Sequence, residues 1–171
     1  RKFFQQVFNV IEDIVVDGNI KKLKEYSFPY LSYLRTQTMY NYFDKQPELL
    51  KDDNHFLNWL FLKYYDYPVS DHSFFKKHEV FITTGMYICL NTTQPAWRIE
   101  RSRTFAEKLF KLLLGDLELP PMSMLSGDEE KDAEALEEFE DAFARIWFGE
   151  AESDSFNRLL ITKAAVQAFT G

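Results

Sequence analysis

Apolar residues recur three and four positions apart over most of the chain, as they do on one face of a helix. Residues 2–16 show this spacing, and Asp17-Gly18-Asn19 follows with a glycine suited to a left-handed helix cap. The pattern predicts a helix that ends there and a short helix from Ile20 to Tyr26. A third helix is predicted from Tyr30 to Phe43, with Pro29 in its first turn, where proline is well tolerated.

The middle of the chain is predicted to contain the most deeply buried helix. Residues 55–65 are apolar on almost every side, which predicts a central helix with Trp59 at its core. Ser70 or Asp71 is expected to cap the next helix. Residues 79–90 are rich in β-branched and aromatic residues, which favour a strand, but no second strand candidate is available to pair with them. We therefore favour a helix there and leave the strand open.

Proline and glycine mark the next boundaries. Thr92-Thr93-Gln94-Pro95 predicts the start of a helix with a hydroxyl cap, and this helix is expected to end at Gly115. Residues 116–128 contain Pro120-Pro121 and several small polar residues, which predicts a linker. The predicted fold class is all-α, and its parts are a helical bundle in 1–115, the linker in 116–128 and an acidic helical pair in 129–171.

Charge changes at the predicted linker. Residues 1–125 hold 16 basic and 15 acidic side chains, whereas residues 126–171 hold 4 and 12. An acidic tail without a basic stripe disfavours a nucleic-acid partner. No apolar run has the length of a membrane span, and a single cysteine, Cys89, suits a reducing compartment. We therefore expect a soluble, cytoplasmic protein that has no nucleic-acid or membrane partner.

Residue patterns for catalysis and cofactor binding are weak. His72 and His78 are six positions apart, which matches neither one helix face nor a zinc-finger spacing. The six glycines form no phosphate-binding motif. We therefore expect no catalytic residue, no cofactor and no metal site in this chain. An anion or partner contact remains open at Trp97, Arg98, Arg101 and Arg103. For the tyrosine series we favour packing in the core and at its rim, because tyrosine buries its ring and keeps its hydroxyl in water, and a ligand pocket or partner groove is the alternative. The series consists of Tyr26, Tyr30, Tyr33, Tyr40, Tyr42, Tyr64, Tyr65 and Tyr67.

The end of the chain carries one longer motif. From Phe139 it reads F-x-x-A-x-x-x-I-W-x-G-E-A-E-S-D-x-F-N-R-L-L. This run, within residues 139–168, resembles a segment of the large NAD-dependent glutamate dehydrogenases that lies just ahead of their catalytic region. The family more often has glycine where this chain has Ser155. The resemblance implies an accessory piece, because the dehydrogenase domain that should follow is not in this sequence.

The resemblance implies a function without catalysis. The chain would be a helical accessory or oligomerisation region of a glutamate dehydrogenase-like protein, with the remainder of the parent chain or a second copy as its protein partner. Residues expected in packing and at this interface are Phe143, Trp147, Phe156, Asn157, Arg158, Leu160 and Phe169. Two alternatives are a stand-alone module for protein interaction and a helical regulator that binds a small molecule among the tyrosines.

Overall fold

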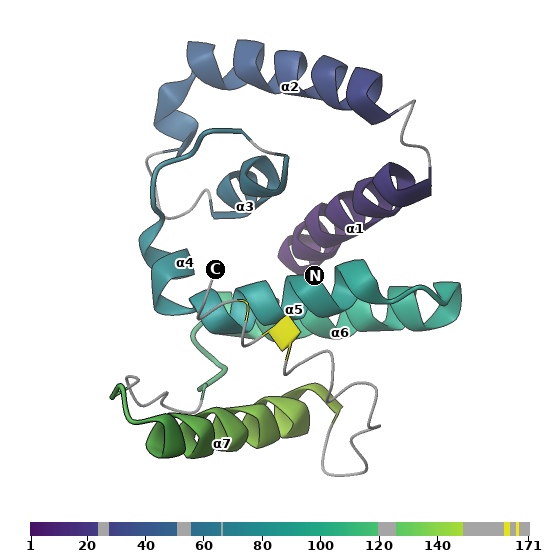
Figure 1. The fold of residues 1–171 in the computed structure, drawn as a ribbon. Helices are drawn as coiled ribbons and strands as arrows, with labels where there is room; N and C mark the ends of the chain where they lie inside the picture. Colours follow the sequence, from purple (N-terminus) through teal and green to yellow (C-terminus); the bar gives the residue numbers. More distant parts are fainter. Residues whose placement is uncertain are drawn as a thin grey trace. The chain divides into compact units, whose positions relative to one another are not determined.

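The computed structural model describes residues 1–23, 28–50, 56–65, 67–119 and 126–148, together with residues 163, 164 and 167. Regular structure in these residues is entirely helical (Figure 1), so the predicted all-α fold class is confirmed. The chain divides into two compact units, Arg1–His78 and Glu79–Gly171. The predicted linker at 116–128 lies inside the second unit, and each unit is described here by itself.

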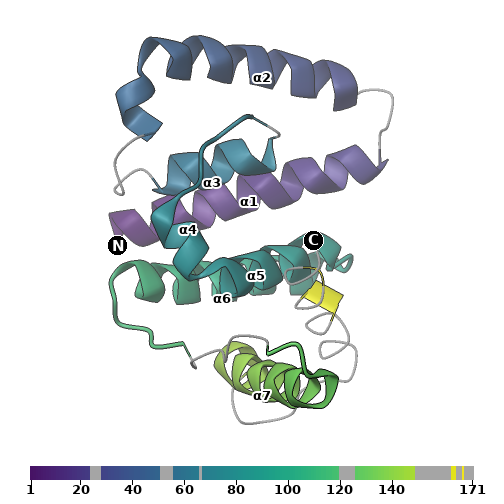
Figure 2. The same cartoon turned by 60° about the vertical axis from the view of Figure 1, so that its left-hand side comes forward.

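The first unit is built around a pair of packed helices. Its elements, in chain order, are α1 (Lys2–Leu23), α2 (Phe28–Lys45), the 3-10 helix η1 (Pro47–Leu50), α3 (Phe56–Tyr64) and α4 (Ser73–Lys77). Helices α1 and α3 lie side by side (Figure 2). The 3-10 helix η1 contacts both α2 and α3. The buried apolar side chains of α1 and α3 are Val7, Ile11, Ile14, Val15, Phe56, Trp59, Leu60 and Leu62.

Helix α1 runs farther than the sequence pattern predicts. It continues through Gly18 to Leu23, so the predicted stop at Asp17-Gly18-Asn19 and the separate helix from Ile20 are wrong. A glycine inside a helix costs about 1 kcal/mol relative to alanine, which tertiary contacts can offset. One such contact is the Tyr65 hydroxyl of the chain after α3, which donates a hydrogen bond to the Asp17 carboxylate.

In the described residues of the second unit, α-helices pack around aromatic rings. These helices are α5 (Glu79–Asn91), α6 (Pro95–Leu113) and α7 (Glu129–Phe148), and α6 contacts both of the others. The segment left open between helix and strand is therefore helical. Gly85 explains how α5 packs closely on α6, because a Cβ atom added at this glycine would lie within 3.0 Å of three carbons of the Phe105 ring.

The helix ends of the second unit are held by specific hydrogen bonds. Gly115, with φ of 77°, donates its N–H to the Leu112 carbonyl, and Asp116 donates to the Lys111 carbonyl, which together form the predicted glycine cap of α6. The predicted hydroxyl cap at the start of α6 is wrong. Gln94 occupies the cap position, and the Thr92 hydroxyl donates instead to the Ile88 carbonyl of the preceding helix, at 2.7 Å.

Two carboxylates, those of Asp128 and Asp132, accept hydrogen bonds from backbone N–H groups at the start of helix α7. The Asp128 carboxylate accepts hydrogen bonds from the backbone N–H groups of Glu130 and Lys131, at 3.1 and 3.5 Å. Asp132 reaches back and accepts from the N–H groups of Ser126 and Gly127, at 2.8 and 3.1 Å. Negative charge at a helix N-terminus also meets the helix dipole favourably. The first residues of the acidic run therefore stabilise the start of α7.

Most of the predicted last helix, 155–169, lies outside the described residues. Lys163, Ala164 and Gln167 are helical, and Ala164 is buried. None of the helices in the described part of the chain is long and apolar enough to cross a membrane.

Candidate functional site

In the described part of the chain, a pocket of the first unit is a candidate binding site. It has a volume of about 330 Å³. It lies where the last turn of α2, the start of η1 and the chain after α3 meet, and Trp59 of α3 forms part of its wall. The residues that line it are Phe43, Asp44, Pro47, Trp59, Tyr67, Pro68, Val69 and Ser70.

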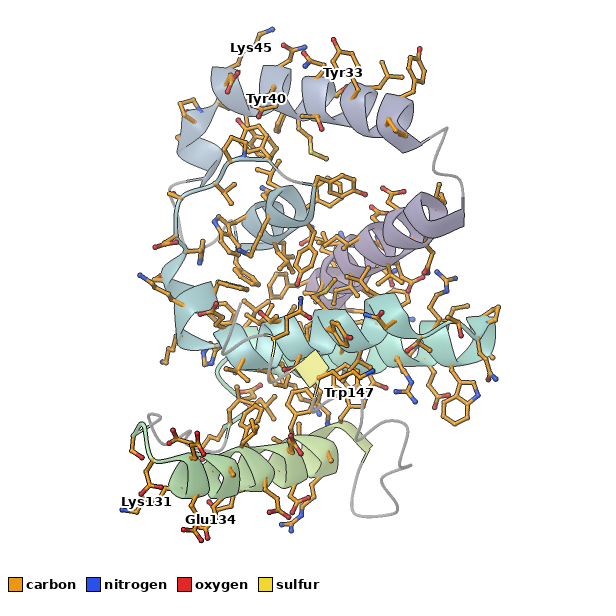
Figure 3. All side chains as sticks on the ribbon, viewed as in Figure 1. Tyr33, Tyr40, Lys45, Lys131, Glu134 and Trp147 are labelled. Carbon is orange, nitrogen blue, oxygen red and sulfur yellow. The ribbon has the colours of Figure 1, made fainter. Side chains whose placement is uncertain are left out.

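The wall of this pocket is fixed by an apolar cluster behind it. Phe43, Leu62 and Tyr67 are buried together, and Met39, Tyr40 and Val69 pack against them. The rings of Tyr40 and Tyr67 are 4.4 Å apart between centroids, and Figure 3 labels Tyr40 on the α2 side of this contact. Closely packed side chains have few alternative rotamers. The packing therefore restricts Phe43, Tyr67 and Val69, which are three of the lining residues.

Asp44 and Tyr67 form the polar part of the pocket. The Tyr67 hydroxyl donates a hydrogen bond to Oδ1 of Asp44, at 3.1 Å. Burial raises the pKa of Tyr67 above its ordinary value of 10.0, and the hydrogen bond and negative charge of Asp44 raise this pKa further. Tyr67 is therefore a neutral hydrogen-bond donor at physiological pH, and the charge of the pair comes from Asp44.

Trp59 joins the pocket to the aromatic core of the first unit. Its indole N–H donates a hydrogen bond to the Ser70 carbonyl at 2.7 Å. This bond links α3 to residues 67–70, which line the pocket. The Trp59 ring lies 4.8 Å from that of Phe75, and the Lys63 ammonium lies 5.3 Å from the indole centroid. The predicted burial of Trp59 is confirmed, since only 3% of its surface is exposed.

The two histidines considered for a metal have structural positions. His72 is the N-cap of α4, and its Nδ1 accepts a hydrogen bond from the Phe74 N–H at 3.2 Å, so the predicted cap at Ser70 or Asp71 is wrong. His78 caps the other end of α4, and burial, followed by the charge of Lys77, lowers its pKa. No group of three or more potential metal ligands occurs in the described part of the chain.

The described residues of the predicted interface set lie in the core of the second unit. Phe143 is 1% exposed and Trp147 is 5% exposed. Phe143 packs on Phe81 of α5, and Trp147 packs on Phe105 of α6, at centroid distances of 5.4 and 5.6 Å. Figure 3 shows Trp147 directed toward α5 and α6, with Glu134 on the opposite side of α7. The other five predicted residues, Phe156, Asn157, Arg158, Leu160 and Phe169, lie outside the described residues.

The proposed basic face on α6 is divided between surface and core. Trp97 is half exposed, whereas Arg101 is buried, and its guanidinium lies 5.4 Å from the Trp97 ring. Arg103 is exposed. The arginines of the predicted patch therefore do not share one exposed surface, which weakens the case for an anion contact there.

The tyrosine series is also divided. Tyr30, Tyr33 and Tyr42 are exposed on α2, whereas Tyr67 lines the pocket. Sequence reasoning had no signal for Asp44, because a carboxylate near the end of a helix is common and only the fold brings it to Tyr67. Among the described residues that line the pocket, Tyr67 is the one tyrosine.

Comparison with known proteins identifies no relative. No protein-family model matches the chain, and neither the curated proteins nor the solved structures contain a significant match.

Proposed function

We propose that this chain is a non-catalytic helical region of a cytoplasmic protein similar to the large NAD-dependent glutamate dehydrogenases. Such enzymes oxidatively deaminate glutamate to 2-oxoglutarate. In this proposal the chain positions or oligomerises the catalytic part and supplies no cofactor site, since its sequence has no glycine-rich phosphate motif.

The observation that supports the proposal is the burial of aromatic residues from the first part of the motif, which lies in α7. Phe139, Phe143 and Trp147 fall four residues apart and are buried, and each ring packs on the next. Phe143 and Trp147 also pack on rings of α5 and α6. The first half of the motif thus serves to attach α7 to its own unit. A motif used for packing supports a structural contribution to the parent protein and gives no indication of chemistry.

A split protein tests this proposal. Residues 1–171 and the remainder of the parent protein would be produced as two separate chains, mixed and purified through a tag on one of them. We expect the two chains to purify together, and a double variant Phe156→Asp, Phe169→Asp to lose this association. Glu134→Gln, at an exposed position of α7, is the control and should keep it. The proposal would be refuted if the remainder of the parent protein did not purify with residues 1–171 and assembled equally well without them.

A second candidate function is a helical regulator that binds a small molecule, and the pocket beside Tyr67 favours it. Its volume of about 330 Å³ lies at the lower end of the range for small-molecule sites, about 300–1,000 Å³. Its lining combines aromatic and proline side chains with one carboxylate. This candidate places ligand binding in the first unit and is compatible with an accessory position in a larger enzyme.

A further inference from the structure

We propose that the Asp44 pocket binds a small organic ammonium ion, with its charge toward Asp44 and its apolar substituents against Phe43, Trp59 and Tyr67. The Asp44 pocket is the cavity lined by the eight residues given above. The proposal rests on the second candidate function, that this pocket is a ligand site. It does not depend on the glutamate dehydrogenase resemblance.

The charge of the pocket favours a cation. Among the described residues that line it, Asp44 is the only charged one. Asp44 also lies in the last turn of α2, which ends at Lys45. The C-terminus of a helix carries roughly half a negative charge from its unpaired carbonyl groups. The carboxylate and the helix end therefore attract a cation to the same place.

Two side-chain hydrogen-bond donors of the pocket, on Tyr67 and Trp59, are already engaged, which disfavours an anion. The Tyr67 hydroxyl donates to Asp44, and the Trp59 indole N–H donates to the Ser70 carbonyl. Pro47 and Pro68 have no backbone N–H to offer. A ligand that needs to accept several hydrogen bonds would find few partners, whereas a ligand that brings positive charge would find a carboxylate.

The aromatic lining selects an alkylated ammonium over a hydrated metal ion. Phe43, Trp59 and Tyr67 supply apolar surface and ring systems whose faces carry partial negative charge, and Lys63 already lies over the Trp59 ring. Cations with carbon substituents gain both from contact with such rings and from electrostatic attraction to them, as quaternary ammonium ligands do in aromatic cages. One carboxylate is too few for a divalent metal ion, which prefers six or more oxygen ligands.

Titration of the whole chain with tetramethylammonium chloride, at constant ionic strength, tests the proposal. The indole N–H signals of the three tryptophans would be followed by nuclear magnetic resonance, with Trp59→Phe to identify the Trp59 signal. We expect the Trp59 signal to shift and saturate with a dissociation constant of roughly millimolar size, as the small contact area of this ion allows. The signals of Trp97 and Trp147 should stay in place.

Two matched variants separate the pocket from general charge effects. Asp44→Asn keeps an oxygen that can accept the Tyr67 hydrogen bond but removes the charge, and it should weaken binding by about tenfold or more. Asp13→Asn removes the same charge from an exposed position on α1 and should leave the affinity unchanged. Equal binding to the wild-type chain and to Asp44→Asn, or a Trp59 signal that never saturates, would overturn the proposal.

Neutral and peptide ligands complete the test. tert-Butanol has a similar shape without the charge, and we expect it to bind at least about tenfold more weakly. If it bound as well as tetramethylammonium, the pocket would remain a ligand site but the ammonium class would be wrong. A peptide with trimethyl-lysine that binds about tenfold more tightly than the free ion would identify a modified side chain as the ligand, and weaker binding would identify a free amine.

Discussion

Replacement of Gly85 by alanine is the sharpest test of the packing between α5 and α6. The added methyl group would lie within 3.0 Å of three carbons of the Phe105 ring, closer than real Cβ atoms approach other atoms. Phe105 is fully buried and cannot swing into solvent. Its ring lies 5.9 Å from that of Phe81 and 5.6 Å from that of Trp147, so the ring has neighbours from α5 and α7.

The expected magnitude follows from two opposing effects. Alanine is favoured over glycine inside a helix by about 1 kcal/mol. Extra volume in a packed core costs about 1–3 kcal/mol, and sometimes more. Because the approach at Gly85 involves a buried ring with neighbours on both sides, we place this cost at the upper end. Gly85→Ala should therefore lower the free energy of unfolding of the second unit by about 2 kcal/mol.

Urea denaturation gives the measurement. In a background with Trp59→Phe and Trp97→Phe, the fluorescence of Trp147 reports on the second unit alone. A double-mutant cycle with Phe105→Leu then tests the cause, because the smaller side chain leaves room for the methyl group. Gly85→Ala should become neutral or stabilising in the Phe105→Leu background. A stabilising effect of Gly85→Ala in the presence of Phe105 would show that α5 and α6 do not pack as described.

The remaining predictions concern three other positions. Trp59→Ala should lower the free energy of unfolding of the first unit by about 3–5 kcal/mol, and a loss below about 1 kcal/mol in urea would contradict its central position. Asp128→Ala should lower the stability of α7 by about 1 kcal/mol, because the helix loses its N-cap. Glu130→Ala should change this stability little, and circular dichroism during denaturation measures both variants. Because the folded chain lowers the pKa of His78, the unfolded chain binds that proton more readily. Stability should then fall as pH decreases through 6.5 toward the folded-state pKa, and His78→Gln should flatten this dependence; an unchanged profile would refute the assignment.

The helices were predictable where periodicity and boundary residues agreed. Pro29 and Gly115 mark real helix boundaries, since proline suits a first turn and glycine a left-handed cap. The helix end predicted at Gly18 was wrong because a glycine permits a helix end without requiring one. The hydrogen bond from Tyr65 to Asp17 joins residues 48 positions apart, and a local sequence pattern cannot predict it. Residues 79–91 show the same limitation, because their strand-like composition yields to packing against α6.

The candidate site was less accessible to sequence reasoning than the fold. Tyrosines suggested an aromatic lining, but Asp44 is 23 residues from Tyr67 along the chain, and only the chain path around η1 brings them together. The pairing of Asp44 with Tyr67 depends on tertiary structure, which a single sequence does not specify by pattern alone. His72 is a different case: its contact with Phe74 is local, but its ring nitrogen replaces the more usual serine or aspartate as a helix cap.

The most direct test of the proposed function is a measurement of NAD reduction with glutamate by the complete parent protein, beside the isolated chain of residues 1–171. We predict that the parent reduces NAD in a glutamate-dependent reaction, and that the isolated chain neither does so nor binds NAD in a calorimetric titration. A parent protein without this activity would contradict the proposed relationship to glutamate dehydrogenases. Saturable micromolar binding of NAD to residues 1–171 would contradict their assignment as a non-catalytic region.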